Sequence, residues 1–170
     1  MLRWLLVASC KGVDIKEVQI WCDGSAIKAP QKQYYCGAGT VLIYGEHIKE
    51  VSTPLGIGTN NIAELTAPIV GLRLLKEPCK VTIYSDSQYT IDCIKKYYKG
   101  WERRGFITQN KGEVKNKGLI IDLYKATQKH HVTWVKVVAH SGVYFNELAD
   151  QLACKASAKS KEIIESGGLN

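Results

Sequence analysis

The chain has 170 residues, of which 45% are hydrophobic and 23% charged, and its formal net charge is +7. This length suffices for one domain whose core needs no disulfides, and no apolar run approaches the ~18 residues of a membrane span. The basic balance indicates a polyanionic partner such as nucleic acid.

Short β-branched or aromatic runs predict strands, and apolar residues that recur every three or four positions predict helices. Thr59, Asn60 and Asn61 supply capping side chains at the start of the first helix. The expected elements, in chain order, are a strand at 18–22, a loop at 26–36, a hairpin of strands 39–44 and 47–53, a helix through 62–75, a strand at 81–85, helices at 87–98 and 119–128, a strand at 132–138 and a helix at 146–159.

This order predicts a single α/β domain, because a hairpin joined to alternating strands and helices gives a mixed sheet with helices on its faces. We expect the domain to span residues 16–160, with an N-terminal extension of unknown role at 1–15 and a C-terminal tail at 161–170. The six cysteines form no C-x-x-C pair and no zinc-binding cluster with histidine. This pattern favours reduced, buried thiols in a cytoplasmic protein.

Acidic residues stand where strands end and helices begin. Asp23 and Asp86 each follow a strand of the buried type. If these strands are parallel neighbours, both carboxylates emerge at the carboxyl edge of the sheet, where open α/β sheets bind ligands. We expect Glu64 in the first turn of its helix and Asp150 in about the first turn of the last helix, where anions are favoured. Taken singly, these acids and Asn146 also suit turn or helix-cap roles.

Four converging carboxylates predict a metal site, because their charges repel one another unless cations lie between them. Mg²⁺ is a hard ion that prefers oxygen ligands and keeps water molecules for a substrate phosphate. Two such ions ~4 Å apart can activate an attacking water and stabilise the leaving oxygen of a phosphodiester. The pattern therefore indicates phosphodiester hydrolysis.

These carboxylates lie within four segments that resemble, in order, the motifs of type 1 ribonuclease H. The segments are Trp-Cys-Asp-Gly-Ser at 21–25, Asn-Asn-Ile-Ala-Glu-Leu at 60–65, Tyr-Ser-Asp-Ser-Gln-Tyr at 84–89, and His-Ser-Gly at 140–142 with Asn146 and Asp150. The resemblance covers about residues 16–160. It implies the ribonuclease H fold, a five-stranded mixed sheet ordered 3-2-1-4-5 and flanked by helices. It also implies hydrolysis of the RNA strand of RNA–DNA hybrids to 5′-phosphate and 3′-hydroxyl ends.

The same resemblance implies a role for each catalytic residue. Asp23 would bridge two Mg²⁺ ions, for which Mn²⁺ is a possible substitute. Glu64 and Asp86 would lie on the leaving-group side, and Asp150 beside the ion that holds the attacking water. His140 would handle protons and assist product release, as an accelerator rather than an essential group. A single loop histidine is more often a surface residue, but its separation of ten residues from Asp150 matches the family.

Two surfaces are expected to bind the hybrid. The RNA strand differs from DNA in its 2′-hydroxyls, and the family positions that contact it correspond to Gly24, Ser25, Asn60, Asn61, Gln88 and Asn146. Asn60 could equally serve only as a helix cap. The DNA strand is expected on the basic protrusion, residues 95–117, which is described next.

The basic protrusion has eight basic and two acidic residues, a net charge of +6 that leaves about +1 for the rest of the chain. Its part at residues 95–106 interleaves cations with aromatic side chains, as nucleic-acid surfaces often do, and resembles a basic protrusion of the family. A solvated, charged helix is the alternative. The expected DNA contacts are Lys95, Lys96, Lys99, Trp101, Arg103 and Arg104, with Trp101 and Thr59 flanking a phosphate.

Two features depart from the family pattern. The loop at residues 27–35 is longer and less glycine-rich than in the family, and Ala29 stands near the position of an asparagine that contacts the hybrid. Pro68 lies inside the helix that carries Glu64. Because proline has no N–H to donate to the Glu64 carbonyl, a local kink is expected.

Other functions fit part of the pattern. A transposase or integrase core shares the carboxylate arrangement, but Glu64, the His140 loop and the basic protrusion together argue against it. A non-catalytic module that binds RNA–DNA hybrids would need only the basic protrusion and the 2′-hydroxyl contacts. Retention of all four carboxylates opposes this module, because bare acids repel phosphate. A small-molecule enzyme fits least well. We expect a monomer that acts on RNA–DNA hybrids and not on membranes.

Overall fold

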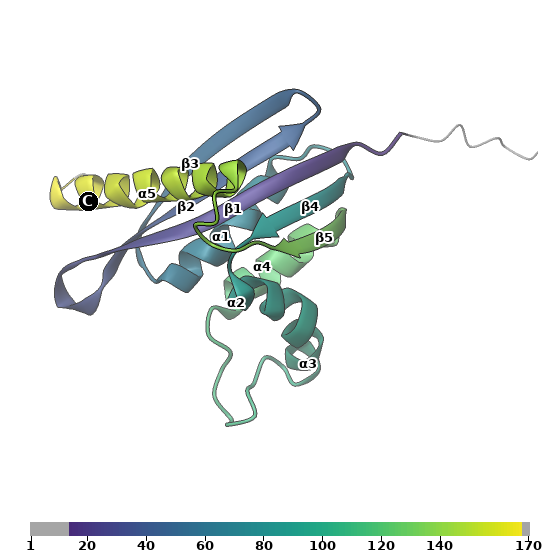
Figure 1. Ribbon diagram of the computed structural model, residues 1–170. Coiled ribbons are helices and arrows are strands. Elements are labelled where there is room, and N and C mark those ends of the chain that lie inside the picture. Colours follow the sequence, from purple (N-terminus) through teal and green to yellow (C-terminus); the bar gives the residue numbers. More distant parts are fainter. Residues whose placement is uncertain (1–13, 168–170) are drawn as a thin grey trace, which may run out of the picture.

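A five-stranded sheet forms the centre of the computed structural model, which describes residues 14–167 (Figure 1). The strand order is β3-β2-β1-β4-β5. β2 pairs antiparallel with β1 and β3, whereas β4 pairs parallel with β1 and β5. The predicted mixed sheet and its order are confirmed. The strands are β1 (Glu17–Lys28), β2 (Tyr34–Tyr44), β3 (His47–Gly58), β4 (Lys80–Ser85) and β5 (His131–Lys136).

The β1–β2 hairpin is longer than expected, and the predicted loop at 26–36 is wrong. β1 continues to Lys28 and β2 begins at Tyr34, so that only a short 3₁₀ turn, η1 (Pro30–Lys32), interrupts the pairing. Gln31 adopts a positive φ of 57°, which helps the chain to reverse within this turn. Because the side chains of the turn are polar, the sequence pattern did not indicate the strands on either side of it.

Helix α5 (Tyr144–Glu165) lies along one face of this hairpin and holds its extended part (Figure 1). The Oγ atoms of Ser25 and Ser157 are 3.0 Å apart, and the Tyr35 hydroxyl donates to Glu165 over 3.2 Å. These residues are far apart in the sequence, so no local pattern predicts their contact. The helix is longer than expected at both ends, and the predicted domain boundary at residue 160 falls inside it.

Helices α1 (Asn60–Arg73) and α4 (Lys117–Thr127) cover the other face of the sheet, over the main core (Figure 1). Successive β1 residues point to opposite faces: Ile20 belongs to the core under α1, and Trp21 to a smaller cluster under α5. α1 runs without interruption through Pro68. Among the other boundaries, β3 ends at Gly58 instead of 53, and β5 ends at Lys136 instead of 138. Helices α1 and α4 begin two residues earlier than predicted and end within two residues of the predicted ends.

α5 lies in backbone contact with β2 at two glycines. A Cβ atom at Gly39 would clash with the carbonyl oxygen of Ala149, and one at Gly37 would clash with the amide nitrogen of Ser157. The α5 residues that face the sheet are correspondingly small and buried: Ala149, Ala153, Ala156, Ser157 and Ser160. This close contact fixes the position of the helical turn that carries Asp150.

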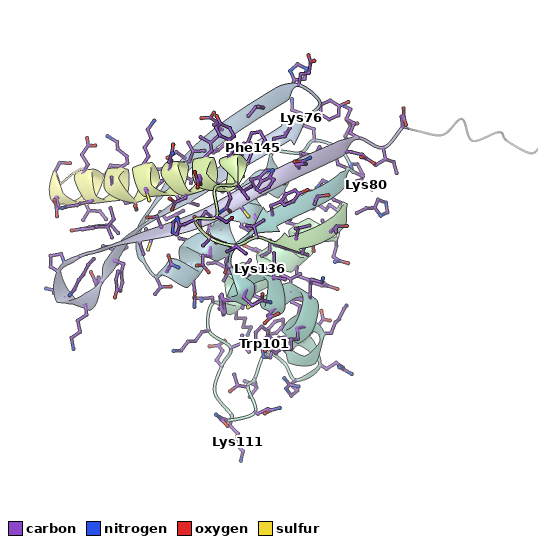
Figure 2. The ribbon with its side chains drawn as sticks, in the orientation of Figure 1. Lys76, Lys80, Trp101, Lys111, Lys136 and Phe145 are labelled. Atoms are coloured by element: carbon purple, nitrogen blue, oxygen red, sulfur yellow. The ribbon has the colours of Figure 1, made fainter. Side chains whose placement is uncertain are left out.

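The basic protrusion extends away from the sheet, and the loop at Lys111 reaches farthest from it (Figure 2). The predicted helix at 87–98 is present but continues for several residues in three pieces. Tyr98 anchors the protrusion, because its ring stacks on that of Tyr124 in α4 with centroids 3.6 Å apart. The three pieces are α2 (Gln88–Asp92), the π-helical turn η2 (Cys93–Tyr97) and α3 (Tyr98–Arg103).

The expectation of buried thiols holds for most, but not all, of the cysteines that the structure describes. Four of its five free cysteines are buried, and Cys154 is exposed. Cys10 and residues 1–13 of the expected extension lie outside the described residues. None of the described helices is long and apolar enough to cross a membrane.

We predict that Gly39→Ala lowers the free energy of unfolding by about 1–3 kcal/mol, because the added methyl group has to displace the α5 backbone. Urea unfolding followed by circular dichroism measures the loss. Gly118→Ala in α4 is the matched control, since nothing lies within 4 Å of its added Cβ and alanine favours a helix by up to ~1 kcal/mol. Equal stability of the two variants would contradict the backbone contact.

Candidate active site at the carboxyl edge of the sheet

Parallel pairing of β1 with β4 places Asp23 beside Asp86. The register pairs Cys22 with Ser85, so the two aspartates are the next residues along each chain. Asp86 follows β4 as predicted. Asp23 does not follow a strand end, because β1 continues in its pairing with β2. The parallel ladder nevertheless ends at Cys22, so both aspartates lie at the same edge of the sheet.

Helices α1 and α5 carry the other two carboxylates, Glu64 and Asp150. Each lies in the second helical turn rather than the first, because both helices begin earlier than expected. Glu64 lies where α1 meets β1 closely: a Cβ atom at Gly24 would clash with the Glu64 amide nitrogen. Asp150 directly follows Ala149, whose carbonyl oxygen contacts Gly39. Glycines therefore allow the approach of both helices.

The four carboxylates influence one another electrostatically. Asp23 is only 9% exposed, and burial is the main cause that raises its pKa to about 8. The charge of Asp86 adds to this rise, and those of Asp150 and Glu64 add less. The Gly24 N–H donates to Asp23 Oδ1 over 2.7 Å and opposes the rise. A buried acid with a strongly raised pKa, surrounded by like charges, is typical of a functional site.

Ser87 is a residue of this site that the sequence interpretation missed. Its hydroxyl donates to Glu64 Oε2 and accepts the Thr90 N–H over 3.2 Å as the N-cap of α2. Asn60 Nδ2 donates to the other oxygen of Glu64 over 2.5 Å. Because Ser87 is the N-cap of α2, the helix-cap interpretation of Asp86 is wrong. The sequence signal that could have indicated Ser87 as a helix N-cap is its position three residues before Thr90. Burial raises the pKa of Glu64, and the Ser87 hydrogen bond opposes that rise.

The oxygen ligands suit a hard divalent cation, but the protein alone does not enclose one. Within residues 14–167, no three His, Cys, Asp or Glu side chains form a group that could hold an ion. Glu64 bonds Ser87 and Asn60 instead. Such an open arrangement suits Mg²⁺, which keeps several waters and binds through few carboxylates together with substrate phosphates.

His140 and Asn146 lie in different surroundings. His140 is exposed in the segment between β5 and α5, with a φ of 53°. Asn146 is only 2% exposed, and its Oδ1 has no hydrogen-bond partner among the described residues. The helix-cap interpretation of Asn146 is wrong, because Val143 is the N-cap of α5. The predicted contact of Asn146 with a substrate stays a prediction.

The other predicted substrate residues form two surfaces. Thr59 is confirmed as the N-cap of α1, since its Oγ1 accepts the Ile62 N–H over 3.3 Å. It belongs to the surface near the carboxylates, which consists of Gly24, Ser25, Thr59, Asn60, Asn61 and Gln88. The second surface, on the basic protrusion, consists of the exposed Lys95, Lys96, Lys99, Arg103 and Arg104, with the half-buried Trp101.

Two further side chains reach the carboxylate edge without having been predicted. Lys136, at the end of β5, donates from Nζ to the backbone carbonyl of Asp86 over 2.6 Å. Cys154, one turn after Asp150, donates from Sγ to Asp150 Oδ1 over 3.7 Å. The pairing of β5 with β4 brings Lys136 to this edge, and no local sequence pattern signals it.

We predict that Asp23→Asn stabilises the metal-free protein at alkaline pH. The Asp23 pKa rises from 3.8 to about 8 on folding, so stability is fully present below the lower value and is lost as the pH rises through the higher one. The variant should gain on the order of 2 kcal/mol at pH 9 and little at pH 4. Urea unfolding in EDTA measures the free energy of unfolding at each pH, and Asp122→Asn, at an exposed position, is the control. Equal gains at both pH values would contradict the raised pKa.

Known proteins resemble this chain over most of its length. The family model RNase H matches residues 15–158 of the chain. A ribonuclease H of Shewanella sp. (strain MR-4) is 43% identical over 154 residues, which cover 91% of this chain and 96% of the relative. A ribonuclease HI of Pasteurella multocida (strain Pm70) is 40% identical over 152 residues, which cover 89% of this chain and 96% of the relative.

A solved structure shares the fold. The crystal structure of LC9-RNase H1, a type 1 RNase H with the type 2 active-site motif, has a TM-score of 0.79 and 24% sequence identity, and the match covers 88% of this chain and 75% of that chain. The strand order, the family match over most of the chain and the identity to full-length relatives together show that the chain belongs to the ribonuclease H family of hydrolases.

Proposed function

We propose that this chain is an endonuclease that hydrolyses the RNA strand of RNA–DNA hybrids and leaves 5′-phosphate and 3′-hydroxyl ends. One observation supports the proposal: the buried Asp23 lies beside Asp86 at one edge of the sheet, and the charges of Asp86, Asp150 and Glu64 add to the rise that burial causes in its pKa. A cluster of oxygen ligands near a strongly basic surface suits the hydrolysis of a polyanion. The four carboxylates are Asp23, Glu64, Asp86 and Asp150.

These carboxylates would hold two Mg²⁺ ions, with Mn²⁺ as a possible substitute. Oxygen ligands fit such hard ions, and cations relieve the repulsion that adds to the effect of burial on the Asp23 pKa. When bound, the ions supply charge stabilisation for the attacking and leaving oxygens of the phosphodiester. We assign Asp23 to both ions. Glu64 and Asp86 are assigned to the leaving-group side, and Asp150 to the side of the attacking water.

Neighbouring groups orient these carboxylates and can move protons. Ser87 and Asn60 each bond one oxygen of Glu64, and the Gly24 N–H bonds Asp23. His140 is exposed beside this edge, and an imidazole can accept or donate a proton near neutral pH. We assign His140 to proton handling and product release.

The two binding surfaces divide the hybrid between them. Hydroxyl, amide and backbone groups around the carboxylates can bond the 2′-hydroxyls that distinguish the RNA strand. The exposed cations of the basic protrusion can neutralise phosphates of the DNA strand, with Trp101 and Thr59 flanking one of them. Asn146, whose buried Oδ1 has no hydrogen-bond partner among the described residues, would add a further contact with the hybrid.

We further propose that the protein acts as a monomer in a reducing compartment such as the cytoplasm. All four carboxylates come from one chain, so a partner copy is not needed to complete the site. Buried free thiols such as Cys22 and Cys93 suit reducing surroundings. The catalytic domain would span residues 16–160 together with the end of α5.

A non-catalytic module that binds RNA–DNA hybrids is the second candidate, and the exposed basic protrusion favours it. The carboxylate edge opposes it, because four uncompensated acids would weaken the binding of phosphate. Cutting, rather than binding, therefore distinguishes the two functions.

We predict that the protein, with Mg²⁺ or Mn²⁺, cuts only the RNA strand of a labelled RNA–DNA duplex. RNA–RNA and DNA–DNA duplexes of the same sequence should stay intact, and EDTA should stop the reaction. Asp23→Asn should lower kcat by ~10³-fold or more, because it removes a shared metal ligand.

Denaturing gels identify the strand that is cut, and end labelling identifies the products. Asp122→Asn is the matched control, because this exposed acid on α4 pairs with Arg73 outside the carboxylate site. Tight binding of the hybrid without cutting under either metal would support the binding module instead.

We predict that the double variant Arg103→Gln, Arg104→Gln raises KM for the hybrid about 10-fold and changes kcat by less than about 2-fold, because these cations bind the phosphate backbone away from the scissile bond. The slope of log KM against log salt should fall by about 1 for each phosphate that the variant no longer neutralises. Lys125→Gln with Lys129→Gln, in the groove between α1 and α4, removes the same charge as a control. A salt slope that stays unchanged would argue against the basic protrusion as a DNA-binding surface.

A further inference from the structure

Lys136, the last residue of β5, makes two hydrogen bonds beside the carboxylates. Its Nζ donates to the backbone carbonyl of Asp86 over 2.6 Å and to that of Val137 over 3.0 Å. Among the ion pairs of residues 14–167, none includes this ammonium. Figure 2 shows Lys136 where β5 ends, whereas Lys80 lies at the opposite end of the neighbouring strand.

The bond to Asp86 extends the contact between β4 and β5 beyond their backbone ladder. The Val137 N–H donates to the Ser85 carbonyl over 3.0 Å. The next carbonyl, that of Asp86, accepts the Lys136 ammonium. The N–H of the same peptide group belongs to Ser87 and donates to Ser85 Oγ over 3.1 Å. The peptide group that joins Asp86 to Ser87 is therefore held at both its carbonyl and its amide.

We propose that Lys136 is a positioning residue for the metal site, because it fixes the peptide group that aims both the Asp86 carboxylate and the Ser87 hydroxyl. The inference rests on the proposed function, in which Asp86 and Glu64 are metal ligands. Ser87 bonds Glu64, so one peptide group governs two ligands. Mg²⁺ tolerates little departure from octahedral geometry, and its binding should therefore depend on this restraint.

The positive charge of Lys136 has the opposite effect on metal binding. Burial raises the pKa of Glu64, and the Lys136 charge is among the causes that lower it, so the ammonium acts on the carboxylates. If charge were its only contribution, its removal would tighten the binding of a divalent cation. Removal of a group that orients metal ligands weakens binding instead, typically by 10–100-fold. The direction of the change separates the two effects.

The experiment measures Mn²⁺ binding without substrate, by electron paramagnetic resonance of the free ion, with Mg²⁺ as a competitor. We expect Lys136→Met to weaken binding of both ions by about 10-fold. Lys136→Arg keeps a charged donor and should restore most of the affinity. Lys80→Met is the matched control, because it removes the same charge where Lys80 pairs with Glu17 at the far end of the sheet, and it should bind Mn²⁺ like the unaltered protein.

Unchanged or tighter Mn²⁺ binding by Lys136→Met would overturn the inference. A lower melting temperature with unchanged Mn²⁺ affinity would show a purely structural role and would overturn it as well. Asp23→Asn separates the two proposals. If the unaltered protein binds no Mn²⁺, or if Asp23→Asn binds it equally well, the metal site itself fails and the inference with it. If Asp23→Asn loses binding and Lys136→Met does not, only the positioning role fails.

Discussion

Carboxylates that emerge side by side from parallel strands impose the main physical constraint on this protein. The β1–β4 register sets Asp23 beside Asp86, and burial of Asp23 deprives its charge of water. Burial and the neighbouring charges disfavour the charged form, and they raise the pKa to about 8. The metal-free fold is thus destabilised as this group ionises, and cations placed between the carboxylates relieve the repulsion. The stability of the fold and the proposed binding of metal ions therefore both depend on the repulsion between these carboxylates.

Close contacts between backbones set the positions of the other two acids, Glu64 and Asp150. α1 approaches β1 at Gly24, next to Glu64, and α5 approaches β2 at Gly39, next to the turn with Asp150. Small residues along α5 permit the second approach. Contacts between backbones leave little room for adjustment, so the positions of the acids follow from packing rather than from flexible side chains.

The groups around the edge compensate for its negative charge with hydrogen-bond donors. The Gly24 N–H, Ser87 and Asn60 bond carboxylate oxygens, while Lys136 bonds the backbone next to one of them. The cations expected to hold the DNA strand lie apart on the basic protrusion, which Tyr98 anchors to α4. The basic side chains proposed to bind the DNA strand are thus separated from the acidic edge, where the metal ions are proposed to bind.

The sequence by itself determined the class of fold and, through family resemblance, the strand order, and it singled out four acids as candidates, because apolar periodicity and motif spacing are local properties of the chain. The tertiary structure alone decided how far the elements extend. It showed that residues 26–36 are mostly paired strand, because contacts such as Tyr35 with Glu165 join segments distant in the sequence. It also revealed Ser87 and Lys136 at the site and the burial of Asn146. These features depend on which strands and helices become neighbours, and the free energy of such long-range contacts leaves no periodic signal in the chain.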